Sequence, residues 1–232
     1  MQCVIIGGGL SIKEGQKLGL SEHLVNKFVI GTNRSYKWFK SDIQTYVDHD
    51  FYNEKYDDLS LLNCVVGQYH RDIKIVASNT HLLRCNGTYY RDVTLGCYKA
   101  SLVGLFSLSL AIHLIDEETI FLLGFDNGTV TDERDSNDRW LTHFYQEDET
   151  EHHRGIGKTS YYAGNRGDKD FGVYKDETKV KIYNVSPKSN IEVFEKIDYP
   201  RFFDLIKDSE LTPEYWAGIE EQISALHYTK LN

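Results

Sequence analysis

The chain has 232 residues, of which 41% are hydrophobic, so it is long enough to form one substantial core. Its net charge of −9 argues against a broad basic face that would hold nucleic acid. The four cysteines are scattered without CxxC spacing, which argues against a zinc site and favours reduced, mostly buried thiols.

From the sequence we expect neither a targeting segment nor a membrane-spanning segment. Its N-terminus enters an apolar stretch without the basic start of a signal peptide. The longest apolar run is shorter than the ~20 residues that cross a bilayer. No linker or internal repeat is visible, so we expect one domain over residues 1–232 and a cytoplasmic location.

The first predicted strand, at 2–6, leads directly into a glycine turn and then into a helical stretch at 12–19. The turn contains Gly7, Gly8, Gly9 and Ser11. This layout is typical of a phosphate-binding loop, because glycines let backbone N–H groups approach a ligand and a helix N-terminus favours an anion. Ser11 also suits a helix N-cap, with Glu14 at the capping-box position. Neither GxGxxG nor a Walker A loop is present, so a tight turn with a capped helix is an equally good interpretation.

The next two predicted strands also end in polar residues. The strand at 27–32 ends at Asn33, which can hydrogen-bond a base or ribose, and Arg34, which can meet a phosphate. The strand at 42–47 ends at Asp48 and Asp50, whose carboxylates lie on the same side of the chain. Such oxygens suit Mg²⁺ or Mn²⁺, so both aspartates are metal-ligand candidates. An ordinary turn and a solvated acidic loop are the alternatives.

A further strand is predicted at 73–77, with Asn79 in the polar segment that follows it. The run at 102–114 is apolar all round, which predicts a helix buried on most sides. At its start, Ser101 and Gly104 would let the backbone approach a ligand, although helix–strand packing explains Gly104 equally well.

The apolar run at 120–125 predicts a strand buried on both faces of a parallel sheet, and it stops at Asp126. In open α/β sheets, ligands bind outside the carboxyl ends of the strands. Asp126 and the polar loop after it are therefore the first candidates for catalytic chemistry.

The segment at about 127–172 is polar and glycine-rich, and we interpret it as a lid. Three of the chain's nine histidines fall within it: His143, His152 and His153. Histidine beside Arg154 and Lys158 favours acid–base work and binding of a phosphate or an acceptor.

After the lid, a strand is predicted at 179–184, followed by a helical tail at about 200–232. Within the tail, helices are expected near 204–209 and 212–228, the second with Thr212 as its N-cap. Alternating strands and helices predict an α/β, Rossmann-like fold: a mostly parallel sheet flanked by helices, with a lid loop and a C-terminal helical tail.

Several segments, in this order, resemble a known superfamily: IIGGGLSIKE, GTNRSY, SNTH, ASLVGLFSLSLAIHLIDEETIFLLGFD, THFYQ and KIYNVSP. The chain is similar over most of residues 1–187 to the bacterial CMP-sialic-acid-type sialyltransferases. It also resembles uncharacterised bacterial and phage proteins related to them and to the archaeal 6-hydroxymethylpterin pyrophosphokinase.

The resemblance implies a nucleotide or nucleotide-sugar site. It places the nucleotide on Gly8, Gly9, Ser11, Asn33, Asn79 and the Ser101–Gly104 region. It also implies a general-base histidine in the lid, without choosing among the three candidates. The superfamily usually has serine directly before the helix glycine, whereas this chain has Val103, which puts the pyrimidine contact in doubt.

Three functions follow from this reading. The first is a glycosyltransferase that moves a sugar from a nucleotide-sugar donor to a hydroxyl on a surface glycan or a modified phage nucleobase. Nucleic acid enters only as that acceptor, and an oligomer is compatible with the sequence. The second is a Mg²⁺-dependent pyrophosphokinase that uses ATP on a small hydroxylated acceptor. The third is a non-catalytic nucleotide-binding protein.

Overall fold

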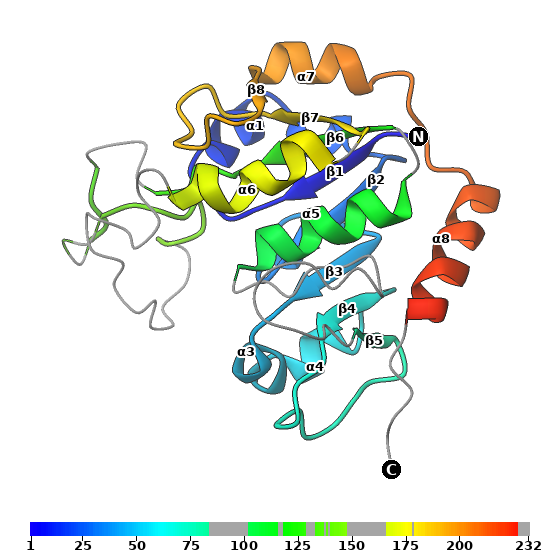
Figure 1. The fold of residues 1–232 in the computed structure, drawn as a ribbon. Coiled ribbons are helices and arrows are strands. Elements are labelled where there is room, and N and C mark those ends of the chain that lie inside the picture. Colours follow the sequence, from blue (N-terminus) through cyan, green and yellow to red (C-terminus); the bar gives the residue numbers. More distant parts are fainter. Residues whose placement is uncertain are drawn as a thin grey trace.

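The structure is a computed structural model that describes residues 1–83, 102–115, 118–128, 133–136, 138, 140–147, 166–177 and 179–226. Its centre is one sheet in the order β5-β4-β3-β2-β1-β6-β7-β8, in which each strand pair is parallel (Figure 1). The strands are β1 (Cys3–Ile6), β2 (Phe28–Thr32), β3 (Ile43–Tyr46), β4 (Val65–Gln68), β5 (Thr80–Leu83), β6 (Thr119–Leu123), β7 (Lys181–Asn184) and β8 (Glu195–Lys196). The expected Rossmann-like α/β fold is confirmed.

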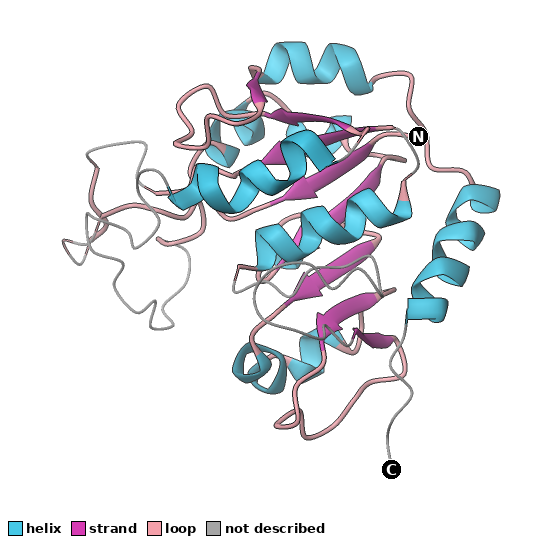
Figure 2. Cartoon of the chain, in the orientation of Figure 1, coloured by secondary structure: helices cyan, strands magenta, loops and turns pink. Residues whose placement is uncertain are grey.

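Helices cover both faces of this sheet, which gives three layers (Figure 2). On one face lie α5 (Val103–Leu114), α6 (Arg166–Glu177) and α8 (Pro213–Leu226). The other face carries α1 (Ile12–Lys17), α2 (Leu20–His23) and α7 (Tyr199–Ile206). A third cluster joins β3, β4 and β5 to α3 (His49–Glu54) and α4 (Tyr56–Leu59), and η1 (Ser35–Lys37) follows β2. Within the described ranges, every helix is too short or too polar to cross a lipid bilayer.

The central strands and α5 confirm the expectation of elements buried on all sides. β1, β2 and β3 are buried at every position, because apolar side chains face helices on both sides of a parallel sheet. α5 tolerates polar residues by pairing them: the Ser107 hydroxyl lies 2.7 Å from the carbonyl oxygen of Val103 and 2.7 Å from Oγ1 of Thr45 on β3.

The prediction of a strand at 73–77 is wrong. That stretch is irregular and leaves Ile75 61% exposed, whereas β4 and β5 form before and after it. β4 gave little sequence signal because it is only Val-Val-Gly-Gln, and Gly67 is required where the Tyr46 ring lies 2.2 Å from the position of a Cβ. Asn79 therefore precedes a strand instead of ending one.

Three details outside the centre differ from expectation. The lid was predicted to extend to about residue 172, but α6 begins at Arg166, so the last part of the predicted lid is helical. α7 begins at Tyr199, earlier than the expected 204, because Asp198 caps it by accepting the N–H of Arg201 at 2.9 Å. β8 was not predicted. The predicted last helix is confirmed as α8, and Thr212 accepts the N–H of Tyr215 at 3.3 Å as its N-cap.

Candidate functional site

A cavity lies where the order of the strands reverses. The chain builds β1 to β5 outward on one side, then returns through α5 to place β6 on the other side of β1. The turns after β1, β2 and β6 therefore meet at the carboxyl edge of the sheet, the position where open α/β sheets bind ligands. The cavity there has a volume of about 260 Å³. It is lined by Gly7, Gly8, Gly9, Thr32, Asn33, Leu102, Val103, Gly104, Gly124, Phe125, Asp126, Asn127, Gly128, Thr142, His143, Tyr145, Phe171 and Ile191.

The turn after β1 packs backbone to backbone on the turn after β6. The N–H of Gly7 donates to the carbonyl oxygen of Leu123 at 2.7 Å, and that of Gly9 donates to Gly124 at 2.8 Å. Gly124 has φ +70, and a Cβ on Gly7 would lie 2.6 Å from the carbonyl oxygen of Gly124. Glycine is thus required by close approach of the two turns, which sequence alone did not separate from ligand binding.

This packing changes the role expected for the glycine turn. The N–H groups of Gly7 and Gly9 already bind carbonyl oxygens, and the N–H of Ser11 binds Oδ2 of Asp126 at 2.9 Å. These three groups are therefore committed to the protein and do not cradle a phosphate. The Ser11 side chain makes no cap hydrogen bond to α1, so the predicted capping box is absent.

Asp126 joins the turn after β6 to its neighbours. It is 1% exposed, and its Oδ1 accepts the hydroxyl of Ser186 at 2.7 Å while Oδ2 accepts Ser11 N–H. Both oxygens are thus bound within the protein. Asp126 lies at the predicted strand end, but its contacts give it a positioning role in the cavity wall.

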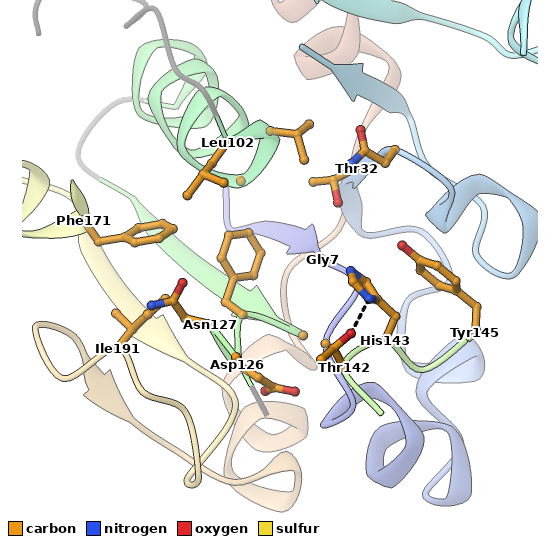
Figure 3. A pocket seen from close by; sticks show the side chains of 18 residues that line it. Gly7, Thr32, Leu102, Asp126, Asn127, Thr142, His143, Tyr145, Phe171 and Ile191 are labelled. Atoms are coloured by element: carbon orange, nitrogen blue, oxygen red, sulfur yellow. Dashed lines mark hydrogen bonds between the residues drawn. The ribbon is translucent and has the colours of Figure 1, made fainter. Parts of the chain in front are cut away.

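His143 is fixed at the cavity by the backbone around it. His143 forms an isolated antiparallel bridge with Gly9, and the N–H of Phe144 donates to the carbonyl oxygen of Gly8 at 3.0 Å. The His143 Nδ1 lies 2.9 Å from the Thr142 hydroxyl oxygen, as Figure 3 shows. Beside it, Tyr145 stacks on Trp38 with ring centroids 5.1 Å apart. The structure therefore brings one lid histidine onto the glycine turn.

The other side of the cavity is apolar. Phe171 from α6 meets Phe125 edge-on with ring centroids 6.0 Å apart, and Ile191 is 1% exposed nearby. Leu102, Phe171 and Ile191 lie across the view from His143 in Figure 3. The first turn of α5 opens here, and Gly104 is required because a Cβ would lie 2.7 Å from the Phe125 ring. Aromatic and apolar walls are typical of small-molecule sites.

Three predicted nucleotide contacts lie outside this lining: Ser11, whose N–H binds Asp126, and Asn79 and Arg34. Asn79 donates its amide to the carbonyl oxygens of Leu59 and Leu62, at 2.9 and 2.7 Å, and so closes the loop before β5. Arg34 lies over the Phe51 ring and reaches Glu54 at 4.0 Å. Asn33, with φ 46, does line the cavity.

Asp48 and Asp50 lie at the start of α3, outside the lining of the cavity. Asp48 caps α3 by accepting the N–H of Asp50 at 2.9 Å, and the Asp50 side chain is 86% exposed. Among the described residues, His49, His70 and Asp72 come close enough together to share an ion. However, the two imidazoles stack at 4.0 Å with planes 7° apart, so one ion cannot lie in both ring planes. As metal ligands, Asp48 and Asp50 stay a prediction.

Five predicted site residues lie outside the described residues: Ser101, His152, His153, Arg154 and Lys158. Conversely, sequence reasoning missed several lining residues, notably Thr142, Tyr145, Phe171 and Ile191. In the sequence, the segment Thr142 to Gln146 is marked only by the motif THFYQ and by the candidate base His143. Its position directly before the histidine-rich stretch was the one signal that could have found Thr142 and Tyr145.

A larger cavity of about 450 Å³ lies at the opposite edge of the sheet, where β2 and β3 begin. It is lined by Lys27, Trp38, Lys40 and Asp42, among others. Because ligands of open α/β sheets bind at carboxyl ends, we assign the function to the smaller cavity. In comparisons with known proteins, no protein-family model, no curated protein and no solved structure matches the chain.

Proposed function

We propose that the chain is a glycosyltransferase that binds a nucleotide-sugar in the cavity at the carboxyl ends of β1, β2 and β6. One observation carries the proposal: the cavity joins an apolar half, suited to a base, to a half in which His143 is held on the glycine turn. A transferase needs this pairing, because the nucleotide must be held while the acceptor hydroxyl loses its proton.

In the proposed reaction, the imidazole of His143 takes the proton of the acceptor hydroxyl. The acceptor oxygen then forms a bond to the anomeric carbon of the sugar, and the bond from that carbon to the phosphate oxygen breaks. The nucleotide leaves with the electron pair of the broken bond. General-base help of this kind contributes about 10²- to 10⁴-fold in rate.

The negative charge of the leaving phosphate needs a positive partner. The first turn of α5 faces the cavity without a side-chain cap, and N–H groups at a helix start carry partial positive charge. Arg154 and Lys158 remain candidates for this role from the lid. The resemblance to the sialyltransferases supports both a nucleotide at this edge and a lid histidine as base.

The proposal is tested by thermal-shift measurements against CMP-, UDP- and GDP-sugars and ATP, each with and without Mg²⁺. We expect one nucleotide-sugar to raise the melting temperature without Mg²⁺. Stabilisation by ATP only with Mg²⁺ would instead support the pyrophosphokinase, and no stabilisation by any nucleotide would contradict a nucleotide site.

The histidine is tested by His143→Gln against His113→Gln, which changes an exposed histidine on α5. With the donor identified, we expect His143→Gln to lower kcat by about 10²- to 10⁴-fold and His113→Gln to leave it unchanged. Equal activity of the two variants would rule out His143 as the base.

A further inference from the structure

A row of buried polar side chains adjoins His143. Thr142, Gln146 and Asp135 are 8%, 6% and 7% exposed. Hydrogen bonds join Thr142 to Gln146 and Gln146 to Asp135. None of the three residues has a part in the proposed reaction. Buried polar groups that are fully connected in this way hold one arrangement, because a broken contact would leave a desolvated donor or acceptor.

The orientation of the Gln146 amide is fixed by its partners. Its Nε2 donates to Oδ2 of Asp135 at 2.8 Å and to the carbonyl oxygen of Trp140 at 3.1 Å. A carboxylate and a carbonyl only accept, so the amide nitrogen must face them. The amide oxygen consequently faces Thr142 and accepts its backbone N–H at 3.0 Å.

The Thr142 hydroxyl has one proton and two neighbours. Its oxygen lies 3.3 Å from the Gln146 amide oxygen and 2.9 Å from Nδ1 of His143. If the hydroxyl proton pointed at His143, the Thr142 hydroxyl oxygen and the Gln146 amide oxygen would face each other with no proton between them. The hydroxyl therefore donates its hydrogen bond to the amide oxygen of Gln146, and its own oxygen accepts a hydrogen bond from the Nδ1–H of His143.

We infer that Asp135, Gln146 and Thr142 are positioning residues that hold neutral His143 as the tautomer protonated on Nδ1. Nε2 is then the acceptor nitrogen of the ring. The use of this nitrogen as a base rests on the proposed function, but the tautomer is a property of the protein without substrate.

The test is NMR of the full chain labelled with ¹⁵N-histidine, recorded without ligand at a pH where the imidazole is neutral. His143→Gln assigns the signals by removing them. We expect a protonated Nδ1 and an unprotonated Nε2 in the unsubstituted protein. Thr142→Val keeps the side-chain shape but removes the hydroxyl, so the preference for Nδ1–H should be lost. Thr142→Ser keeps the hydroxyl and should retain it.

A proton on Nε2 in the unsubstituted protein, or the same tautomer in Thr142→Val, would overturn the inference. Because the NMR measurement needs no substrate, it tests the tautomer even if the proposed glycosyltransferase function is wrong. With the donor identified, Thr142→Val should lower kcat at least tenfold with KM for the donor unchanged, and Thr142→Ser should restore it. If Thr142→Val kept full turnover while His143→Gln lost it, His143 would still be the general base, but the positioning role of Thr142 would be rejected.

Discussion

Gly8 is the residue at which the glycine turn meets the lid. A Cβ there would lie 2.7 Å from Cδ2 of His143 and 3.1 Å from the hydroxyl oxygen of Tyr145. Gly8→Ala should therefore displace the His143 ring while leaving the sheet intact. We expect kcat to fall at least tenfold with a small change in melting temperature. Gly172→Ala is the matched control, because its Cβ would meet Val193 at an ordinary 3.7 Å. Equal activity of the two variants would contradict the contact.

Asp126 gives a prediction about stability. Both of its oxygens accept hydrogen bonds in a buried position, from Ser11 and Ser186. Asp126→Asn would turn an NH₂ group toward one of these donors, which leaves a buried polar group unsatisfied. We expect a loss of about 1–3 kcal/mol in the free energy of unfolding, measured by urea denaturation. An unchanged midpoint would show that the two hydrogen bonds do not stabilise the turn.

The thiols of Cys3 and Cys64 provide a prediction about reactivity. Burial raises the pKa of Cys3 well above its usual value, and burial together with Glu220 raises that of Cys64 to about 12. Because the thiolate is the reactive form, both remain protonated at pH 8. We expect neither to react with a maleimide until the chain is unfolded in urea, as read by mass spectrometry of their peptides. Rapid labelling of either in the native protein would contradict its burial.

At the residue scale, strand-end reasoning from sequence found Asn33 and Asp126. The start of the apolar helix and the lid histidines gave Gly104 and His143, and all four residues line the cavity. Strand-end reasoning failed for Asn79, whose position depended on a strand that does not form. It also did not find Thr142, because a threonine within an aromatic segment has no signature until its neighbours are known.

At the element scale, burial decided which predictions succeeded. β1, β6 and α5 are long enough or apolar enough to be recognised alone, and they carry the core. The segment at 73–77 is as apolar as a strand, yet β4 takes the place beside β3 and β5 takes the edge beside β4. Pairing between distant short strands is a property of the assembled sheet, and local sequence does not contain it.

α8 offers a simple prediction at this scale. Gly218 lies in the middle of the helix, and a Cβ there would have no atom within 4 Å. Alanine restricts the unfolded chain more than glycine does and is the better helix former. Gly218→Ala should raise the free energy of unfolding by about 0.5–1 kcal/mol, measured by urea denaturation. A decrease would mean that this helix face is covered by something else.

At the scale of the whole molecule, the reversal of strand order creates the site. The sequence predicted a carboxyl edge rich in polar residues but could not order the strands along it. The order puts the turns of β1, β2 and β6 together and leaves Asp48 and Asn79 outside the cavity lining. The proposed nucleotide site follows from topology as much as from any motif.

The most direct test of this account is a ¹H–¹⁵N NMR titration of the chain with the panel of nucleotide-sugars. We predict that one of them shifts the amide signals of Gly8, Asn33, Gly104 and His143 together, since all four line the cavity. The account would be contradicted if the panel left these signals unchanged, or if the shifts gathered instead at Lys27 and Asp42 around the cavity at the opposite edge of the sheet.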